Sequence, residues 1–234
     1  MRLAIVGGTG KLGSGLALRW ASAGHTISLG SRAPARARAH AAELQGKLSA
    51  YEARDLAAPR GSEGAIQGGE NAWAAGEGEV VVLTVPYEAH AETLRTIVSA
   101  IGGKVLLDTT VPLKPPGVSR VHVPPGQAAA LEAQALVGAS IPVVAALHHV
   151  SATHVANLTQ PIASDVLVAS DDARAKSVAM GLVRDLGLRG LDAGPLVNAI
   201  ALESLTPVLI HLNRTYKSRG TGIVFTDLPG SDPR

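Results

Sequence analysis

The chain has 234 residues, of which 21 are Lys or Arg and 19 are Asp or Glu, so its formal net charge is only +2. Because charges of both signs are interleaved, the composition argues against nucleic-acid binding. The chain contains no cysteine, which excludes disulfides, thiolate nucleophiles and Cys-bound metals and fits a cytoplasmic protein. We expect neither a cleaved signal peptide nor a membrane span, because no apolar segment with a cleavage site follows the first residues and no apolar run approaches membrane-spanning length.

A strand, a glycine turn and a helix occupy the first 24 residues. Residues 2–6 are a short apolar run that predicts a buried strand, and residues 8–13 (Gly-Thr-Gly-Lys-Leu-Gly) fit the pattern G-x-G-x-x-G. The glycines permit a tight turn, close approach of a pyrophosphate and packing of the helix on the strand. The helix that follows faces the same phosphate with free N–H groups. We therefore predict that a dinucleotide phosphate lies over Gly8 and Gly10.

The second predicted strand, residues 25–29, leads into Gly30-Ser31-Arg32 and favours NADP over NAD. In an NAD site, a carboxylate about 20 positions beyond the glycines accepts hydrogen bonds from the ribose 2′-hydroxyl, and no carboxylate stands at that place here. Ser31 can donate a hydrogen bond to a 2′-phosphate. Arg32, with Arg36 or Arg38 one turn later, can pair with the phosphate charge.

The middle of the chain alternates predicted helices and strands. We expect a helix over 33–48, a strand over 48–52, a surface loop over 57–69, a strand over 79–85, a helix over 88–100 and a strand over 104–108. Open α/β sheets bind ligands beyond the carboxyl ends of their strands. The residues that we therefore expect to line the cofactor are Val85, Pro86, Thr109 and Val111. For Asp108, a turn or cap carboxylate is favoured over a catalytic base.

The last half of the chain continues the alternation, which predicts an α/β protein. We expect a Pro-rich loop over 114–125, a helix over 127–137, a strand over 142–147, short strands over 165–169 and 190–193 around a helix over 172–186, and a long helix over 196–216. Pro207 lies inside this last helix and is expected to kink it.

His148 and His149 stand where a strand is predicted to end. An imidazole at such a place can donate a hydrogen bond or a proton near neutral pH, although a structural role accounts equally well for either residue. No carboxylate or thiol accompanies these residues and His154 at a standard metal-site spacing, so we predict no metal site.

The last helix carries polar residues on an otherwise apolar surface, among them Ser204 and Thr206. Such residues either satisfy backbone groups or form a wall of a ligand site. The basic run over 213–219 is open to two interpretations in the same way. It either complements the helix dipole or binds an anionic substrate.

Six motifs together resemble those of the NADPH-dependent reductases of coenzyme F420. In chain order they are Gly7-Gly8-Thr9-Gly10-x-Leu12-Gly13, Gly30-Ser31-Arg32, Leu83-Thr84-Val85-Pro86, Ala146-Leu147-His148, Asp192-Ala193-Gly194-Pro195-Leu196 and Glu203-Ser204-Leu205-Thr206-Pro207. The early motifs are shared by many NADP proteins, whereas the last two are much more specific. The resemblance implies a Rossmann-type, doubly wound, mostly parallel sheet over 1–155. It also implies a small C-terminal α/β part over 156–234 for substrate binding and dimerisation, which ends in the long helix.

The same resemblance implies a homodimer that exchanges a hydride between NADPH and F420, an 8-hydroxy-5-deazaflavin. It assigns Thr9, Gly10, Lys11 and Leu12 to the pyrophosphate, and Ser31, Arg32 and Arg36 to the 2′-phosphate. It assigns Val85 to the ribose, and His148, Val150, Ser204 and Thr206 to the two stacked rings. Ile200 departs from the archaeal members, which carry at this place an arginine linked to the deazaflavin. Recognition of F420 must therefore rely on another residue, such as Arg214 or Lys217.

The chemistry expected from this resemblance is positioning of two rings in a dry slot, with NADPH C4 delivering a hydride to deazaflavin C5. His148 would hydrogen-bond a ring and stabilise charge growing at N1, and Ser204 and Thr206 would set ring orientation. Two other enzyme classes are disfavoured, because the Lys-x-x-x-Asn of β-hydroxyacid dehydrogenases and the Tyr-x-x-x-Lys of short-chain reductases are absent from the sequence. A reductase of another flavin-like or ferric acceptor and a non-enzymatic NADP sensor remain alternatives.

Overall fold

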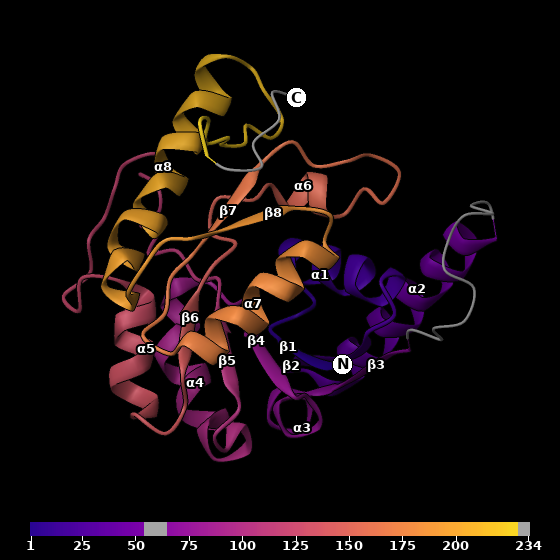
Figure 1. Ribbon diagram of the computed structural model, residues 1–234. Coiled ribbons are helices and arrows are strands. Elements are labelled where there is room, and N and C mark those ends of the chain that lie inside the picture. The colour runs from indigo at the N-terminus through magenta and orange to yellow at the C-terminus, as the bar shows by residue number, and fades with distance from the viewer. Residues whose placement is uncertain (54–64, 229–234) are drawn as a thin grey trace.

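The computed structural model of the chain describes residues 1–53 and 65–228. Its main sheet has six strands in the order β3-β2-β1-β4-β5-β6, and all neighbouring strands are parallel (Figure 1). The winding of the chain changes direction between β1 and β4, which is the switch point at which such sheets bind ligands. The strands are β1 (Arg2–Val6), β2 (Thr26–Ser31), β3 (Ile66–Glu70), β4 (Val80–Leu83), β5 (Val105–Asp108) and β6 (Val143–Ala145).

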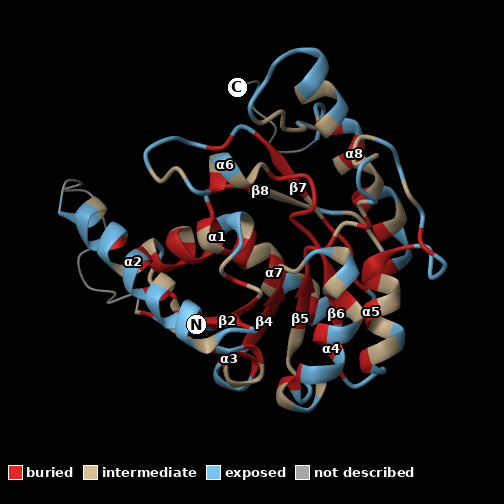
Figure 2. Cartoon of the chain, turned by 180° about the vertical axis from the view of Figure 1, so that it is seen from behind, coloured by how far each residue is buried: buried red, intermediate tan, exposed pale blue. Residues whose placement is uncertain are grey.

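Helices cover both faces of the sheet, because its strands are apolar on both sides. One buried cluster joins Leu3 and Ile5 to α1, α2 and α7, and a second joins Ala4 and Val6 to α3, α4 and α5. Figure 2 shows the buried strands enclosed by helices whose outer surfaces are exposed. These helices are α1 (Lys11–Ser22), α2 (Pro34–Glu52), α3 (Asn71–Glu77), α4 (Tyr87–Ile101), α5 (Ala129–Val137) and α7 (Ala173–Asp185).

A smaller unit follows β6. Its strands β7 (Asp165–Val168) and β8 (Arg189–Asp192) pair in parallel on either side of α7, and an antiparallel bridge between Ala145 and Ala169 links the unit to the end of β6. The remaining elements are α6 (Ala152–Val155), the 3₁₀ turn η1 (Leu196–Asn198) and α8 (Ala199–Thr215). The α/β, Rossmann-type fold with a small C-terminal part and a long last helix is therefore confirmed.

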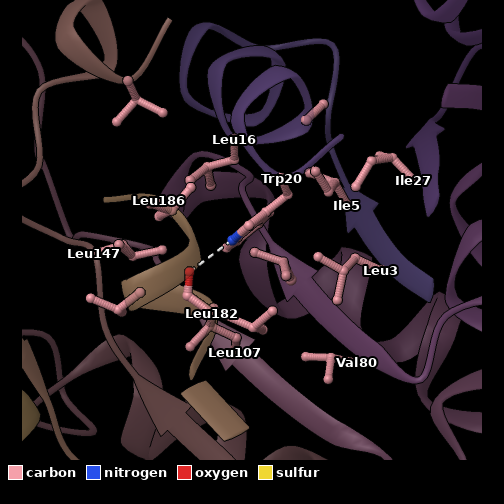
Figure 3. Close-up of a cluster of buried hydrophobic side chains, with 14 of the residues drawn as sticks. Leu3, Ile5, Leu16, Trp20, Ile27, Val80, Leu107, Leu147, Leu182 and Leu186 are labelled. Atoms are coloured by element: carbon pink, nitrogen blue, oxygen red, sulfur yellow. Dashed lines mark hydrogen bonds between the residues drawn. The ribbon is translucent and has the colours of Figure 1, made fainter. Parts of the chain in front are cut away.

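Helix α1 connects the glycine turn to this smaller unit. The indole Nε1 of Trp20 donates a hydrogen bond of 2.9 Å to the carbonyl of Leu182 in α7, inside the buried cluster that Figure 3 shows. The Arg19 guanidinium donates to the carbonyls of His154 and Val155, at 3.1 Å and 2.8 Å. The helix that follows the glycine turn thus also fixes the segment that follows His148.

Two predictions about the region between residues 48 and 70 were wrong. The predicted strand over 48–52 is the end of α2, because Leu44 and Leu48 continue the buried stripe of that helix. The predicted loop over 57–69 falls partly on residues 57–64, which lie outside the described part of the chain, and its last residues form β3. The glycines of β3 leave no room for a side chain, because other groups pack closely against them. A Cβ on Gly68 would lie 2.2 Å from the carbonyl oxygen of Ala37, and one on Gly69 would lie 2.1 Å from the Trp73 ring.

The last helix also differs from expectation. Its first turn is the 3₁₀ turn η1, and α8 then runs from Ala199 to Thr215 with Pro207 inside it. Within the described residues, the stretch Leu196–Thr215 is long and apolar enough, by length and composition alone, to cross a membrane, so the expectation that no run has this length was wrong. In the fold this helix buries Leu202, Glu203 and Leu209.

Candidate functional site

The turn between β1 and α1 leaves room for a ligand against its backbone. Gly7 has a φ of +72°, and a Cβ there would lie 2.5 Å from Val85. A Cβ on Gly13 would lie 2.7 Å from the Cα of Gly8, so helix and turn are in contact. Helix α1 begins after Gly10 without a side-chain cap and without an acidic residue in its first turn. Its first N–H groups and positive dipole end suit an anion, as a pyrophosphate site requires.

Asn71, the first residue of α3, supports this turn, and the sequence analysis did not identify it. Its Oδ1 accepts a hydrogen bond of 3.2 Å from the Gly7 N–H, and a Cβ on Gly30 would lie 2.8 Å from the same oxygen. The side chain is therefore held between the ends of β1 and β2. The signal that could have found it is its place directly after a strand, which was hidden because β3 was interpreted as a loop.

The end of β2 and the first turn of α2 place three groups suited to a 2′-phosphate on one side of the glycine turn. Ser31 is nearly buried, and its Oγ accepts a hydrogen bond of 3.2 Å from the Ala33 N–H, which leaves the hydroxyl proton free to be donated. Arg32 and Arg36 are both exposed. All three residues line the same cleft as the glycine turn.

This cleft, of about 490 Å³, lies beyond the carboxyl ends of the parallel strands. It brings together most of the predicted cofactor residues, together with Thr84, Thr93 and Thr110. The predicted residues that line it are Thr9, Gly10, Lys11, Leu12, Ser31, Arg32, Arg36, Val85, Pro86, Thr109, Val111 and His148. Gly8 and Val150 are not among the described residues that line it, because Gly8 packs under Leu29 and Val150 is buried in the turn after β6.

A wider hollow of about 1180 Å³ lies at the opposite edge of the sheet, where β5 and β6 begin. It contains Lys104, Gln134 and Arg174 but neither the glycine turn nor the start of α1. Since ligands of open parallel sheets bind at the carboxyl ends of the strands, we place the functional site in the smaller cleft.

Threonine hydroxyls tie the strand ends that form the wall of the cleft. Thr84 Oγ1 donates to the Val6 carbonyl at 3.0 Å, and Thr109 Oγ1 donates to the Leu83 carbonyl at 2.8 Å. The Asp108 carboxylate, at the end of β5, accepts the Thr110 N–H at 2.9 Å, as the predicted turn carboxylate would. These hydrogen bonds hold the ends of β1, β4 and β5 in fixed positions relative to one another, so the wall of the cleft is rigid.

His148 lines the cleft from the turn after β6. The preceding residue, Leu147, has a φ of +67°, a left-handed conformation that is strained for a residue with a β-carbon. The residue is only 5% exposed, and neither ring nitrogen has a hydrogen-bond partner within the described residues. Burial lowers the pKa of His148 to about 4, so the ring is neutral near pH 7 and offers one donor and one acceptor.

Thr206 and Ser204, both on α8, are not among the described residues lining the cleft. Thr206 Oγ1 donates to the carbonyl of His148 at 2.8 Å, so it holds the backbone of the histidine. Ser204 Oγ donates to the Ile200 carbonyl, one turn earlier in its own helix. The structure therefore brings Thr206 to the site through His148 and does not bring Ser204 to it.

The other two histidines considered as ligands lie elsewhere. His149 Nε2 contacts the Asp165 carbonyl at 2.9 Å, beneath β7, and His154 belongs to α6. Across residues 1–53 and 65–228, no three His, Asp or Glu side chains are arranged to hold a metal ion.

The family profile matches the first half of the chain, and the similar proteins match nearly its full length. A family profile described as "NADP oxidoreductase coenzyme F420-dependent" matches residues 2–112. The F420-dependent NADP reductase of Methanothermobacter marburgensis is 38% identical, over 98% of this chain and 100% of the relative, and that of Methanocaldococcus jannaschii is 37% identical over 97% and 99%. A crystal structure described as a putative F420-dependent NADP reductase from Arthrobacter sp. FB24 superposes with a TM-score of 0.75 at 23% identity, covering 96% of this chain and all of the other, which shows the shared fold. The chain thus belongs to the F420-dependent NADP reductase family.

Proposed function

We propose that this protein is an oxidoreductase that transfers a hydride between NADPH and coenzyme F420. The observation that carries the proposal is the identity of 38% to an F420-dependent NADP reductase across essentially the whole of both chains. The cleft supports it independently, because an uncapped helix N-terminus, exposed arginines and a buried imidazole that has no hydrogen-bond partner among the described residues line one cavity. These features fit a dinucleotide with a 2′-phosphate at one end and a reactive ring at the other.

The adenine half of NADP lies toward β2. The backbone of Thr9, Gly10, Lys11 and Leu12 binds the pyrophosphate, and Ser31, Arg32 and Arg36 bind the 2′-phosphate. Arginine pairs with phosphate through charge-assisted hydrogen bonds that NADH cannot offer. Val85, Pro86, Thr109 and Val111 then line the ribose and nicotinamide beyond the switch point, where the cleft continues.

NADPH supplies a hydride from nicotinamide C4 to deazaflavin C5 when both are bound. The chain contributes positioning, exclusion of water and a hydrogen-bonding group. His148 is neutral and has no hydrogen-bond partner within the described part of the chain, so it donates a hydrogen bond to a polar atom of a bound ring and does not act as an acid. Thr206 fixes the main chain of His148, and Val150 packs beneath the same turn. Ser204 bonds to the main chain of its own helix and does not touch a ring.

F420 requires a second binding surface next to His148. Ile200 is partly buried against the apolar cluster, so it offers no charge there. Arg214 and Lys217 are exposed at the end of α8, and Arg214 donates to Ser119 Oγ at 3.2 Å, which brings it beside the loop that follows Val111. We assign an anionic part of F420 to these two residues.

We further propose a cytoplasmic homodimer in which residues 1–155 bind NADP and residues 156–234 serve F420 binding and dimerisation. Support for the dimer comes from η1 and α8, whose shared outer face is apolar and open. Val197 and Val208 are 48% and 46% exposed, and Ala201 between them is also exposed. Such a stripe buries well against a second copy of itself.

The test is spectroscopic. Purified protein mixed with NADPH and oxidised F420 should bleach the visible absorbance of the deazaflavin, and NADH should replace NADPH poorly. Riboflavin phosphate and a ferric chelate, run in parallel, test the alternative of a different acceptor. Binding of NADPH without reduction of any of the three acceptors would instead indicate an NADP-sensing protein.

A further inference from the structure

A buried ion pair lies directly behind the wall of the cleft. His90 Nε2 on α4 lies 2.7 Å from Asp108 Oδ2 at the end of β5, and the two side chains are 2% and 0% exposed. Neither is among the described residues that line the cleft. Their immediate neighbours do line it: Ala89 and Thr93 on α4, and Thr109 after β5.

Asp108 connects this pair to the cleft through the main chain. Its second oxygen, Oδ1, accepts the Thr110 N–H at 2.9 Å. Thr109 and Thr110 both line the cleft, and Thr109 also bonds to the end of β4. His90 therefore orients a carboxylate that in turn fixes the backbone against which a ligand rests.

The surroundings keep the pair ionised. The groups that face His90 are Asp108 from β5, Glu132 from α5, Glu203 from α8, and Tyr87 on its own helix, whose ring stacks at 6.3 Å. Burial raises the pKa of Glu203 to about 8, so near pH 7 the charge that stabilises the pair comes chiefly from Asp108. Burial lowers the pKa of His90, but the charge of Asp108 and its hydrogen bond outweigh this and raise the pKa above the ordinary value. Burial likewise raises the pKa of Asp108, and the charge of His90 outweighs it in the opposite direction. A buried pair of this kind adds little net stability but holds one geometry.

We propose that His90 is a positioning residue for hydride transfer: through Asp108 it fixes the Thr109–Thr110 segment as the wall on which the nicotinamide of NADPH rests. The inference rests on the proposed function for the identity of the ring. Because the phosphate contacts lie at the opposite end of the cleft, loss of the pair displaces the ring and leaves most of the binding energy in place. The effect therefore falls on the hydride-transfer rate and not on NADPH affinity.

Two substitutions separate this role from simple packing. In His90→Gln the side-chain amide replaces the Nε2 donor to Asp108, whereas His90→Phe fills the space without a donor. We expect the Gln protein to show the same emission of bound NADPH and the same single-turnover rate of hydride transfer as the wild-type protein. The Phe protein should bind NADPH within about threefold of wild type, lose the emission change that reports an immobilised ring, and transfer hydride about 10- to 100-fold more slowly. The wild-type rate should also fall as pH rises through the raised pKa of His90, and this alkaline limb should be missing from the Gln protein.

The emission measurement needs no F420. A wild-type protein that fails to reduce F420 would overturn the proposed function, while the emission of the two variants would still decide the role of His90. The inference would be overturned if the Phe protein kept the wild-type NADPH emission and hydride-transfer rate. It would also be overturned if the Gln protein lost emission and rate as much as the Phe protein does. If thermal unfolding shows that the Phe protein is not folded, His90→Asn, whose shorter amide does not reach Asp108, is judged by the same criteria.

Discussion

The hydroxyl of Thr206 donates a 2.8 Å hydrogen bond to the main-chain carbonyl of His148, across 58 positions of the sequence. It joins α8 to the strained turn after β6, in which Leu147 has a φ of +67°. The His148 ring itself has no hydrogen-bond partner among the described residues, so its backbone is what orients it. The position of the imidazole in the cleft therefore depends on α8.

Replacing Thr206 with Val should slow turnover with little effect on NADPH binding. The substitution keeps the shape of the side chain but removes its donor, so the His148 carbonyl loses a hydrogen bond and the ring loses its fixed orientation. We expect kcat with F420 to fall about tenfold, which corresponds to roughly 1.4 kcal/mol. Steady-state kinetics and calorimetric titration with NADPH measure the two effects separately.

Thr206→Ser is the matched control, because serine retains the donor. It should recover most of the lost kcat. Equal loss in the Ser and Val proteins would show that the methyl group, and not the hydrogen bond, maintains the site.

Replacing Arg32 with Ala should remove the preference for NADPH. The exposed guanidinium lines the cleft beside Ser31, where a 2′-phosphate would lie. Charge-assisted hydrogen bonds of this kind contribute about 1.5–3 kcal/mol, so the Kd for NADPH should rise about 10- to 100-fold. The Kd for NADH should not change, and parallel titrations with the two nucleotides provide the check. An equal rise for both nucleotides would place Arg32 outside the 2′-phosphate site.

Asn71→Ala should weaken the binding of NADPH and NADH by the same factor, whereas Arg32→Ala should weaken only the binding of NADPH. Its Oδ1 accepts the Gly7 N–H, so its loss leaves a part-buried donor without a partner and loosens the glycine turn. We expect the free energy of unfolding to fall by about 1–2 kcal/mol and both affinities to fall by the same factor. Chemical denaturation and the same pair of titrations test this. A loss of affinity for NADPH alone would contradict the role of Asn71 in shaping the glycine turn.

The first half of the site was predictable from sequence because its signals are local. The run over 2–6, the glycines that follow it and the basic end of β2 each carry their own pattern, and the structure places the corresponding side chains in one cleft. Strand β3 was not predictable in this way. The absence of side chains on its glycines lets the Ala37 carbonyl and the Trp73 ring pack closely against the strand. These are tertiary contacts, and in the sequence alone such glycines are typical of a loop.

The other half of the site depends on contacts that no local pattern contains. Ser204 and Thr206 are two positions apart on the same helix, yet one bonds to its own helix and the other to His148. The spacing of polar residues on a helix gives the face that they occupy, but not which neighbouring backbone meets that face. Asn71 was missed because β3, which ends directly before it, resembles a loop in the sequence, and because its partner Gly7 lies 64 positions away.

Acid should destabilise the protein partly through His148. Its pKa is about 4 in the folded protein against 6.5 ordinarily, so the unfolded chain takes up a proton first as pH falls. The contribution to stability is present above pH 6.5 and is lost on the way down to about 4, by roughly 3 kcal/mol in total. His148→Asn should flatten this part of the curve of unfolding free energy against pH. Burial also lowers the pKa of His149, so part of the slope should remain in the Asn protein. An unchanged slope in the Asn protein would show that His148 is protonated in the fold.

Arg214→Ala, made alone and together with Lys217→Ala, should weaken the binding of F420 without changing the binding of NADPH. Both cations are exposed at or just after the end of α8, and Arg214 contacts Ser119 in the loop beyond Val111. Neither is among the described residues that line the cleft with Ser31, Arg32 and Arg36. Because exposed charge pairs are screened, each removal should raise the KM for F420 only about three- to tenfold, and the effect should shrink as salt is added. Arg219→Ala, another exposed cation a few residues further along, is the control and should change neither constant. A KM that is the same in the double variant and in the wild type, at low salt, would mean that the charge absent at Ile200 is replaced from elsewhere in the chain.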